Sequence, residues 1–179
     1  LHSFPTRRSS DLSASPTLVN NTLVGNSSDD RGVLRFRGGS SPLVANTIIA
    51  FNSGGVDKED TSCVDLRNNC VYGNAGFDFK GMTAPSADSG NISADPQLAA
   101  LEYGDARLQA SSPCINAGDS SQTPAGLSDK GGNQRVVGGA VDIGAFESVS
   151  PLVSASPRII RVKTDGNDAN NGSTWTLAK

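Results

Sequence analysis

The side chains best suited to acid–base chemistry are charged residues in the first half of the chain. Asp57, Glu59 and Asp60 form an acidic run, and Arg35 and Arg37 precede it. Two carboxylates placed across a glycosidic bond can hydrolyse that bond. No motif fixes such a pairing here, and charges of this kind are usually solvated. We interpret these residues as exposed loop charges and keep polysaccharide hydrolysis as an alternative.

The only histidine, His2, lies in a segment that we interpret as foreign to the protein. Residues 1–12, LHSFPTRRSSDL, read as one frame of a widely used short-read sequencing adapter, and every residue fits. The alternative is a natural basic tail. Residues derived from an adapter are not part of the natural protein, so they carry no information about its fold. Without His2 the chain has no histidine for general acid–base catalysis, for a Ser-His-Asp arrangement or for binding a metal.

The three cysteines, Cys63, Cys70 and Cys114, lack the spacing of zinc ligands. A secreted chain of this kind can hold one disulfide. Small buried apolar residues are the simpler interpretation, because free cysteine packs like a small hydrophobic side chain.

Residues 165–168, Asp-Gly-Asn-Asp, resemble the start of a calcium loop but depart from the EF-hand pattern. Ala169 falls where an oxygen ligand is needed, and Asn170 falls where the loop needs glycine. We interpret the segment as a turn. We therefore predict no catalytic residue, no cofactor-binding residue and no metal-binding residue, and keep Ca²⁺ as a minor alternative.

Composition excludes several classes of protein. The formal net charge is −3; residues 1–12 contribute Arg7, Arg8 and Asp11, which is +1, so the remainder carries −4 (−3 minus +1). Without a basic patch, nucleic acid is not an expected partner. No apolar run approaches the roughly 18–20 residues of a membrane span. Twenty glycines and only 5% aromatic residues favour a turn-rich β protein over a helical one.

A repeat of two asparagines with five residues between them organises the first half of the chain. The pairs are Asn20 and Asn26, Asn46 and Asn52, and Asn68 and Asn74. Successive copies are spaced by roughly 22–26 residues, and a period of this length built from short β-branched runs is typical of one coil of a solenoid. Asparagine tolerates the left-handed backbone of sharp turns, and its amide can bond its copy in the next coil. Sugar contact or glycosylation is the alternative role.

We therefore expect an all-β, right-handed parallel β-helix of few coils, each with three short strands. The expected strand segments are residues 17–24, 32–36, 42–51, 63–66 and 69–72. Beyond residue 75 the repeat fades into Gly-rich, polar sequence, which suits an irregular C-terminal cap over the open end of the solenoid. In that cap we interpret the charged residues as ion pairs and turn bonds, with a structural Ca²⁺ as a minor alternative. They are Asp129, Arg135, Asp142 and Glu147.

Three segments of this C-terminal region carry a family resemblance: ADPQL, RLQASSPCINAGD and GNQRVVGGAVDIGAFE. They resemble the closing signature of bacterial right-handed parallel β-helix repeat proteins of the choice-of-anchor Q type, in the pectate-lyase-like superfamily. The resemblance covers roughly residues 13–148. It implies a large, secreted or surface-attached, multidomain bacterial protein.

The same resemblance implies a second chemistry, β-elimination of uronates. Lyases of this fold use Ca²⁺ held by acidic side chains and an Arg or Lys that abstracts a proton. In this chain Arg35, Arg37 or Arg67 beside the acidic run at residues 57–60 is the candidate set on one face.

The domain organisation that we expect has four parts. Residues 1–12 are adapter-derived, and residues 13–147 form the β-helix coils and their cap. Residues 148–157, SVSPLVSASP, have the composition of a linker. Residues 158–179 resemble the truncated start of a following β-helix-like module, so we expect the natural protein to be longer than this chain.

Two functions from different classes follow from these observations. The first is a noncatalytic extracellular or cell-surface module, structural or adhesive, with a polysaccharide or a surface protein as partner. The alternative is a fragment of a polysaccharide lyase or glycoside hydrolase whose active face lies mostly in missing coils. Sugar-binding faces usually present Trp or Tyr, and before Trp175 the chain offers only Tyr72 and Tyr103. This scarcity favours the noncatalytic module.

Overall fold

The structure is a computed structural model, and it describes residues 15–28 and 30–148. In this part of the chain the regular elements are short β-strands and single turns of 3-10 helix, without an α-helix. The strands of the repeat are, in chain order, β1 (Thr17–Val19), β2 (Thr22–Val24), β3 (Leu34–Phe36), β4 (Leu43–Ala45), β5 (Ile48–Ala50), β6 (Val56–Lys58), β7 (Asp65–Arg67), β8 (Cys70–Tyr72) and β9 (Phe79–Lys80).

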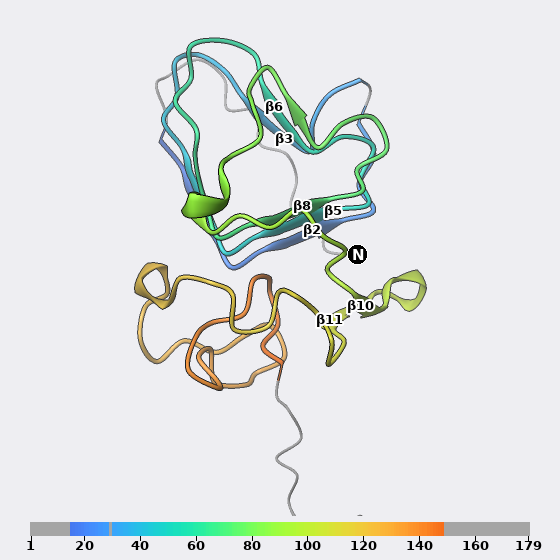
Figure 1. Cartoon of the computed structure of the whole chain (residues 1–179), viewed down its shortest axis with the longest axis vertical. Helices are drawn as coiled ribbons and strands as arrows, with labels where there is room; N and C mark the ends of the chain where they lie inside the picture. The colour runs from blue at the N-terminus through green and yellow to red at the C-terminus, as the bar shows by residue number, and fades with distance from the viewer. Residues whose placement is uncertain (1–14, 29, 149–179) are drawn as a thin grey trace, which may run out of the picture. The chain divides into compact units, whose positions relative to one another are not determined.

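These strands form three parallel sheets of three strands each, in the orders β1-β4-β7, β2-β5-β8 and β3-β6-β9. Each strand pairs with its copy in the next coil, so that Thr17 aligns with Leu43 and Leu43 with Asp65. In sheets β1-β4-β7 and β2-β5-β8 the register therefore advances from coil to coil by the same steps as the asparagine repeat. Figure 1 shows the coils stacked on one another. The parallel β-helix of few coils is confirmed.

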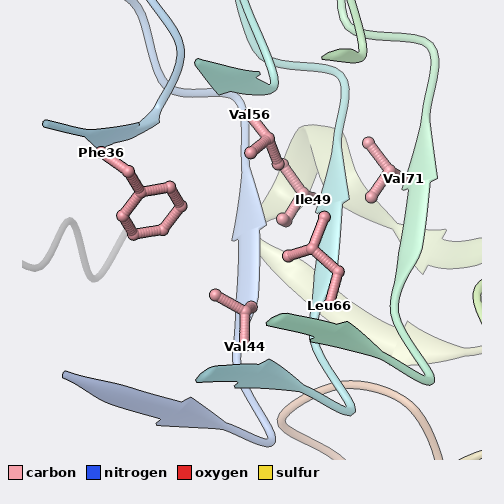
Figure 2. Close-up of a cluster of buried hydrophobic side chains, with 6 residues drawn as sticks. All are labelled: Phe36, Val44, Ile49, Val56, Leu66 and Val71. Carbon is pink, nitrogen blue, oxygen red and sulfur yellow. The ribbon is translucent and has the colours of Figure 1, made fainter. Parts of the chain in front are cut away.

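The interior of the coils holds one apolar cluster, to which all three sheets contribute side chains. Its buried members, drawn in Figure 2, are Phe36, Val44, Ile49, Val56, Leu66 and Val71. Successive side chains on a strand point to opposite faces, so a strand of three residues contributes only one or two of them to this interior. Burial of each such side chain stabilises the fold by about 1.5–3 kcal/mol. Because the coils are stacked, they form one continuous core.

The two asparagines of each repeat have different roles. Asn20, Asn46 and Asn68 adopt positive φ angles of 59°, 49° and 48°, which confirms the left-handed turns. The second members form the expected ladder: Asn26 Nδ2 donates to Asn52 Oδ1 at 3.0 Å, and Asn52 Nδ2 donates to Asn74 Oδ1 at 2.9 Å. Hydrogen-bonded copies thus run through the stack.

A further buried column that the sequence analysis did not single out lies one residue after each left-handed asparagine. The Thr47 amide donates to Asn69 Oδ1 at 3.0 Å, and Asn69 Nδ2 donates to Asn91 Oδ1 at 3.0 Å. Asn91 belongs to a partial fourth layer, because Ile92 bridges Cys70 in parallel. The stack therefore extends slightly beyond the third coil.

The region after the coils is largely irregular. Its elements are η1 (Ala87–Ser89), β10 (Leu98–Ala100), η2 (Leu101–Tyr103), β11 (Asp105–Leu108) and η3 (Ser120–Gln122), with β10 and β11 antiparallel. We call residues 96–147 the covering segment, because they pack on the outer face of sheet β2-β5-β8. There Ile48 and Ala50, which point away from the coil interior, are buried with Leu98 and Ile143.

The position of this segment differs from the expected cap. We expected it to close the end of the stack, whereas its contacts run along the side of the coils. The physical reason is that β5 is apolar on both faces, so its outer side also needs cover.

Predictions for residues 1–12 and 149–179, which include the turn at 165–168 and Trp175, lie outside the described residues.

Candidate functional site

Arg35, Asp57 and Lys80 form a column of charged side chains on the outer face of sheet β3-β6-β9, and we call it the charged column. In the strand register Arg35 aligns with Asp57, and Asp57 with Lys80. Because Phe36 and Val56 point into the core, their strand neighbours point outward. The sheet thus places a carboxylate between two cations.

Asp57 is buried within this column, with 1% of its surface exposed. Its Oδ2 has no hydrogen-bond partner and lies 3.9 Å from Lys80 Nζ. The Arg35 Nε is likewise buried without a partner. A buried carboxylate without a nearby cation is strongly unfavourable, so the approach of Lys80 offsets part of the cost of burying Asp57.

Further charged and polar groups contact the cations of the column. The Arg35 guanidinium forms an ion pair with Glu59, and Arg31 Nη1 lies 4.0 Å from the same carboxylate. Lys80 Nζ donates to the carbonyl of Asp30 at 3.0 Å. Arg35, a candidate proton acceptor for a lyase, is therefore already bound to a carboxylate.

The other residues of that candidate set lie elsewhere. Arg67 is on sheet β1-β4-β7, where its Nη2 lies 2.7 Å from Asp65 Oδ2. Asp60 follows β6, and hydrogen bonds from Ser62 lower its pKa to about 2. Arg37 follows β3 and is half-buried. The expectation of one face is correct for Arg35 with Asp57 and Glu59, and wrong for Arg67.

The covering segment holds the second group of charges, and all four predicted residues are buried. Arg135 Nε lies 3.6 Å from Glu147 Oε1, and its Nη1 donates to the Ala145 carbonyl at 3.0 Å. Asp129 accepts the amides of Asn133 and Glu147 at 2.7 and 2.8 Å. The interpretation as ion pairs and turn bonds is confirmed for these contacts.

Burial and hydrogen bonding shift the pKa values of this group in opposite directions. Burial raises the pKa of Glu147 to about 7 and also raises that of Asp142. Burial alone would raise the pKa of Asp129, but hydrogen bonds from the Glu147 amide and from Asn133 outweigh it and lower the value. Burial lowers the pKa of Arg135. The four charges therefore influence one another, and their oxygens already face N–H donors.

The donor set does not favour the alternative of a structural Ca²⁺ at this group. A calcium site offers several oxygens to the ion. Here a guanidinium lies among the carboxylates, and Asp142 accepts the amides of Asn116 and Ser148 at 2.7 and 2.5 Å. In the described part of the chain no three His, Cys, Asp or Glu side chains cluster as a metal site.

A partly exposed aromatic pair was not predicted from the sequence. Phe51 and Tyr72 meet edge to face, with ring centroids 6.0 Å apart, and Phe51 is 36% exposed. Phe51 has a φ of 56°, while the equivalent positions in the other coils are Gly25 and Gly73. Aligning the repeats shows this replacement, because all three residues come directly before the second asparagine of their repeat.

The cysteines occupy two environments. Cys63 is exposed, whereas Cys70 and Cys114 are buried in the cluster between β8 and the covering segment. All three are free thiols, and the interpretation as small buried residues is correct for two of them.

No helix among the described residues is long and apolar enough to cross a membrane. Comparison with protein-family models, with curated proteins and with solved structures found no match for this chain.

Proposed function

We propose that this β-helix is a noncatalytic module of an extracellular or cell-surface protein, where it serves as a rigid structural or adhesive element that associates with polysaccharide. The observation that carries the proposal is the way in which the covering segment is bound to each coil. Because the covering segment is bound to every coil, it holds the coils in place. This is expected of a rigid element that presents its outer faces to a binding partner.

One asparagine from every coil makes this connection. Asn20 Nδ2 donates to Thr123 Oγ1, Asn46 Nδ2 to the Asp119 carbonyl, and Asn68 Nδ2 to the Ala117 carbonyl, all at 3.0 Å. Asn46 Oδ1 also accepts the Asp119 amide at 2.8 Å. A coil cannot leave the stack without breaking its contact with the covering segment.

Three further observations support this function. In the charged column Arg35 is paired with Glu59, and Lys80 lies 3.9 Å from Asp57, so the group suits stability better than proton transfer. The resemblance of the C-terminal segments to choice-of-anchor Q proteins supports the secreted or surface location. The aromatic pair Phe51 and Tyr72 supports association with sugars, since exposed aromatic rings stack on apolar faces of ligands.

The unpartnered Oδ2 of Asp57 favours a second candidate, a fragment of a polysaccharide lyase or hydrolase. A buried polar atom without a hydrogen-bond partner is rare in folded proteins, and a catalytic role is one explanation for it. In that case Arg35, Asp57 and Lys80 belong to the active face.

The test is binding and cleavage by the full chain on a panel of neutral and uronate-containing polysaccharides, with Ca²⁺ and with chelator. We expect retarded migration in polysaccharide gels and no release of unsaturated or reducing products. The variant Phe51→Gly should weaken the retardation, and Arg67→Gln, on another sheet, is the control. Products that form with Ca²⁺ and vanish in Asp57→Asn would establish the enzyme instead.

A further inference from the structure

Cys70 and Cys114 lie opposite each other at the contact between the coils and the covering segment. Cys70 begins β8, and its side chain points away from the coil interior, on the face opposite its neighbour Val71. Cys114 comes from the covering segment. Both are 0% exposed, and both belong to the apolar cluster that contains Ile48 and Ile143.

The backbone on both sides of the pair is held in place. The Cys114 amide donates to Ser112 Oγ at 3.2 Å, and its carbonyl accepts the Ile143 amide at 2.9 Å. The Cys70 amide donates to the Thr47 carbonyl at 3.0 Å. Two anchored main-chain positions therefore direct their sulfurs into one dry cluster.

The two thiols share one buried cluster and influence each other: Cys114 raises the pKa of Cys70, and Cys70 lowers the pKa of Cys114. Cys70 Sγ also donates to the Ala94 carbonyl at 3.2 Å. The thiolate is the nucleophile in disulfide exchange.

We propose that Cys70 and Cys114 form a disulfide that fastens the covering segment to β8, while Cys63 stays outside the pair. The oxidant is a small-molecule disulfide such as oxidised glutathione. The Cys114 thiolate attacks one glutathione sulfur and releases the first reduced glutathione. Cys70 then gives its proton to solvent and attacks the Cys114 sulfur, which releases the second glutathione as its thiolate. Two protein thiols are oxidised, and one glutathione disulfide is reduced.

This bond forms during folding, because both sulfurs are buried once the covering segment has packed. It closes a loop of roughly 45 residues, and a cross-link over a loop of this length restricts the unfolded chain strongly. The proposal goes beyond the proposed function and shares with it only the oxidising, extracellular compartment.

Refolding of the full chain tests the pair directly. The denatured, reduced chain is refolded in a mixture of reduced and oxidised glutathione, remaining thiols are alkylated, and the protein is digested with trypsin without reduction. Cleavage after Lys58, Arg67, Lys80, Arg107 and Lys130 places the three cysteines on separate peptides, 59–67, 68–80 and 108–130. We expect peptides 68–80 and 108–130 joined, and Cys63 alkylated or carrying glutathione.

Stability gives the second readout. The variant Cys63→Ser should keep the cross-link, and its Tm should fall by roughly 10 °C on reduction. The variants Cys70→Ala and Cys114→Ala, which keep a small apolar side chain, should show no such fall. The proposal is overturned by a folded chain whose Cys70 and Cys114 are both alkylated, by a cross-link that contains Cys63, or by refolding that succeeds only with the pair reduced.

Discussion

At Glu147 a carboxylate is buried beside Arg135, and burial raises its pKa to about 7 from the usual 4.5. Between these two pH values the folded chain keeps a proton that the unfolded chain has lost. The free energy of unfolding must therefore fall as pH rises from about 4.5 to 7. Asp142, whose pKa is also raised, acts in the same sense, whereas Asp129, whose pKa is lowered, acts in the opposite sense below about pH 4.

We predict that the free energy of unfolding is about 1–3 kcal/mol lower at pH 7.5 than at pH 5. Urea denaturation at the two pH values measures it. Glu147→Gln keeps an acceptor for the Asp142 amide but cannot titrate, so most of this difference should disappear. A variant with an unchanged difference would exclude Glu147 as its source.

Asp57 allows a second test at this scale, because it lies buried between cations. Asp57→Asn leaves Lys80 without the carboxylate that lies 3.9 Å from it, and we expect it to lower the free energy of unfolding by roughly 1–3 kcal/mol. The control is Arg67→Gln, whose pair with Asp65 is half exposed on both sides and should be worth less than about 1 kcal/mol. If both variants lost the same free energy of unfolding, the burial of Asp57 would not contribute to stability.

At the scale of strands and turns, the internal ladder is the element that unites the coils. Asn52 is its central member: Oδ1 accepts from Asn26, and Nδ2 donates to Asn74 Oδ1 and to the Leu23 carbonyl. The side chain is 2% exposed, so water cannot replace these partners.

We predict that Asn52→Ala lowers the free energy of unfolding by about 3 kcal/mol, because several buried groups lose their partners. Asn26→Ala, at the start of the ladder, should cost only about 1 kcal/mol, since Asn52 keeps its bond to Asn74. Urea denaturation followed by circular dichroism compares the two. A similar loss in both would show that the ladder does not act through its central member.

The sequence allowed the repeat, its steps and the left-handed asparagines to be predicted, because each follows from residue type and spacing between neighbouring coils. The partners of those asparagines could not be predicted. Asn20 bonds Thr123, which is 103 residues away, and no local pattern encodes such a contact. One signal was present for the covered face: residues 48–50 are apolar without alternation, which is typical of a strand buried on both sides.

At the scale of the whole molecule, the fit between coils and covering segment depends on one close approach. Gly144 has a φ of 119°, and its amide donates to the Asn46 carbonyl at 2.9 Å. A Cβ at this position would lie 2.8 Å from Ile48 Cδ1 and 3.0 Å from Thr22 Oγ1. Any side chain would therefore push the segment away from β5 and also strain its backbone.

We predict that Gly144→Ala loosens the covering segment while the coils stay folded, because the ladders and the coil core do not involve residue 144. The amides of residues 143–145 should exchange with solvent at least ten times faster in the variant than in the unmodified chain. The amides of β5 and β8 that are hydrogen-bonded to neighbouring coils should stay protected. The control is Gly126→Ala, where φ is 80° but nothing lies within 4 Å of the new Cβ, so strain alone of about 1 kcal/mol is expected. If Gly144→Ala instead unfolds coils and segment in one transition, the covering segment is an obligate part of the β-helix core. The rigid module would then fold as one cooperative unit.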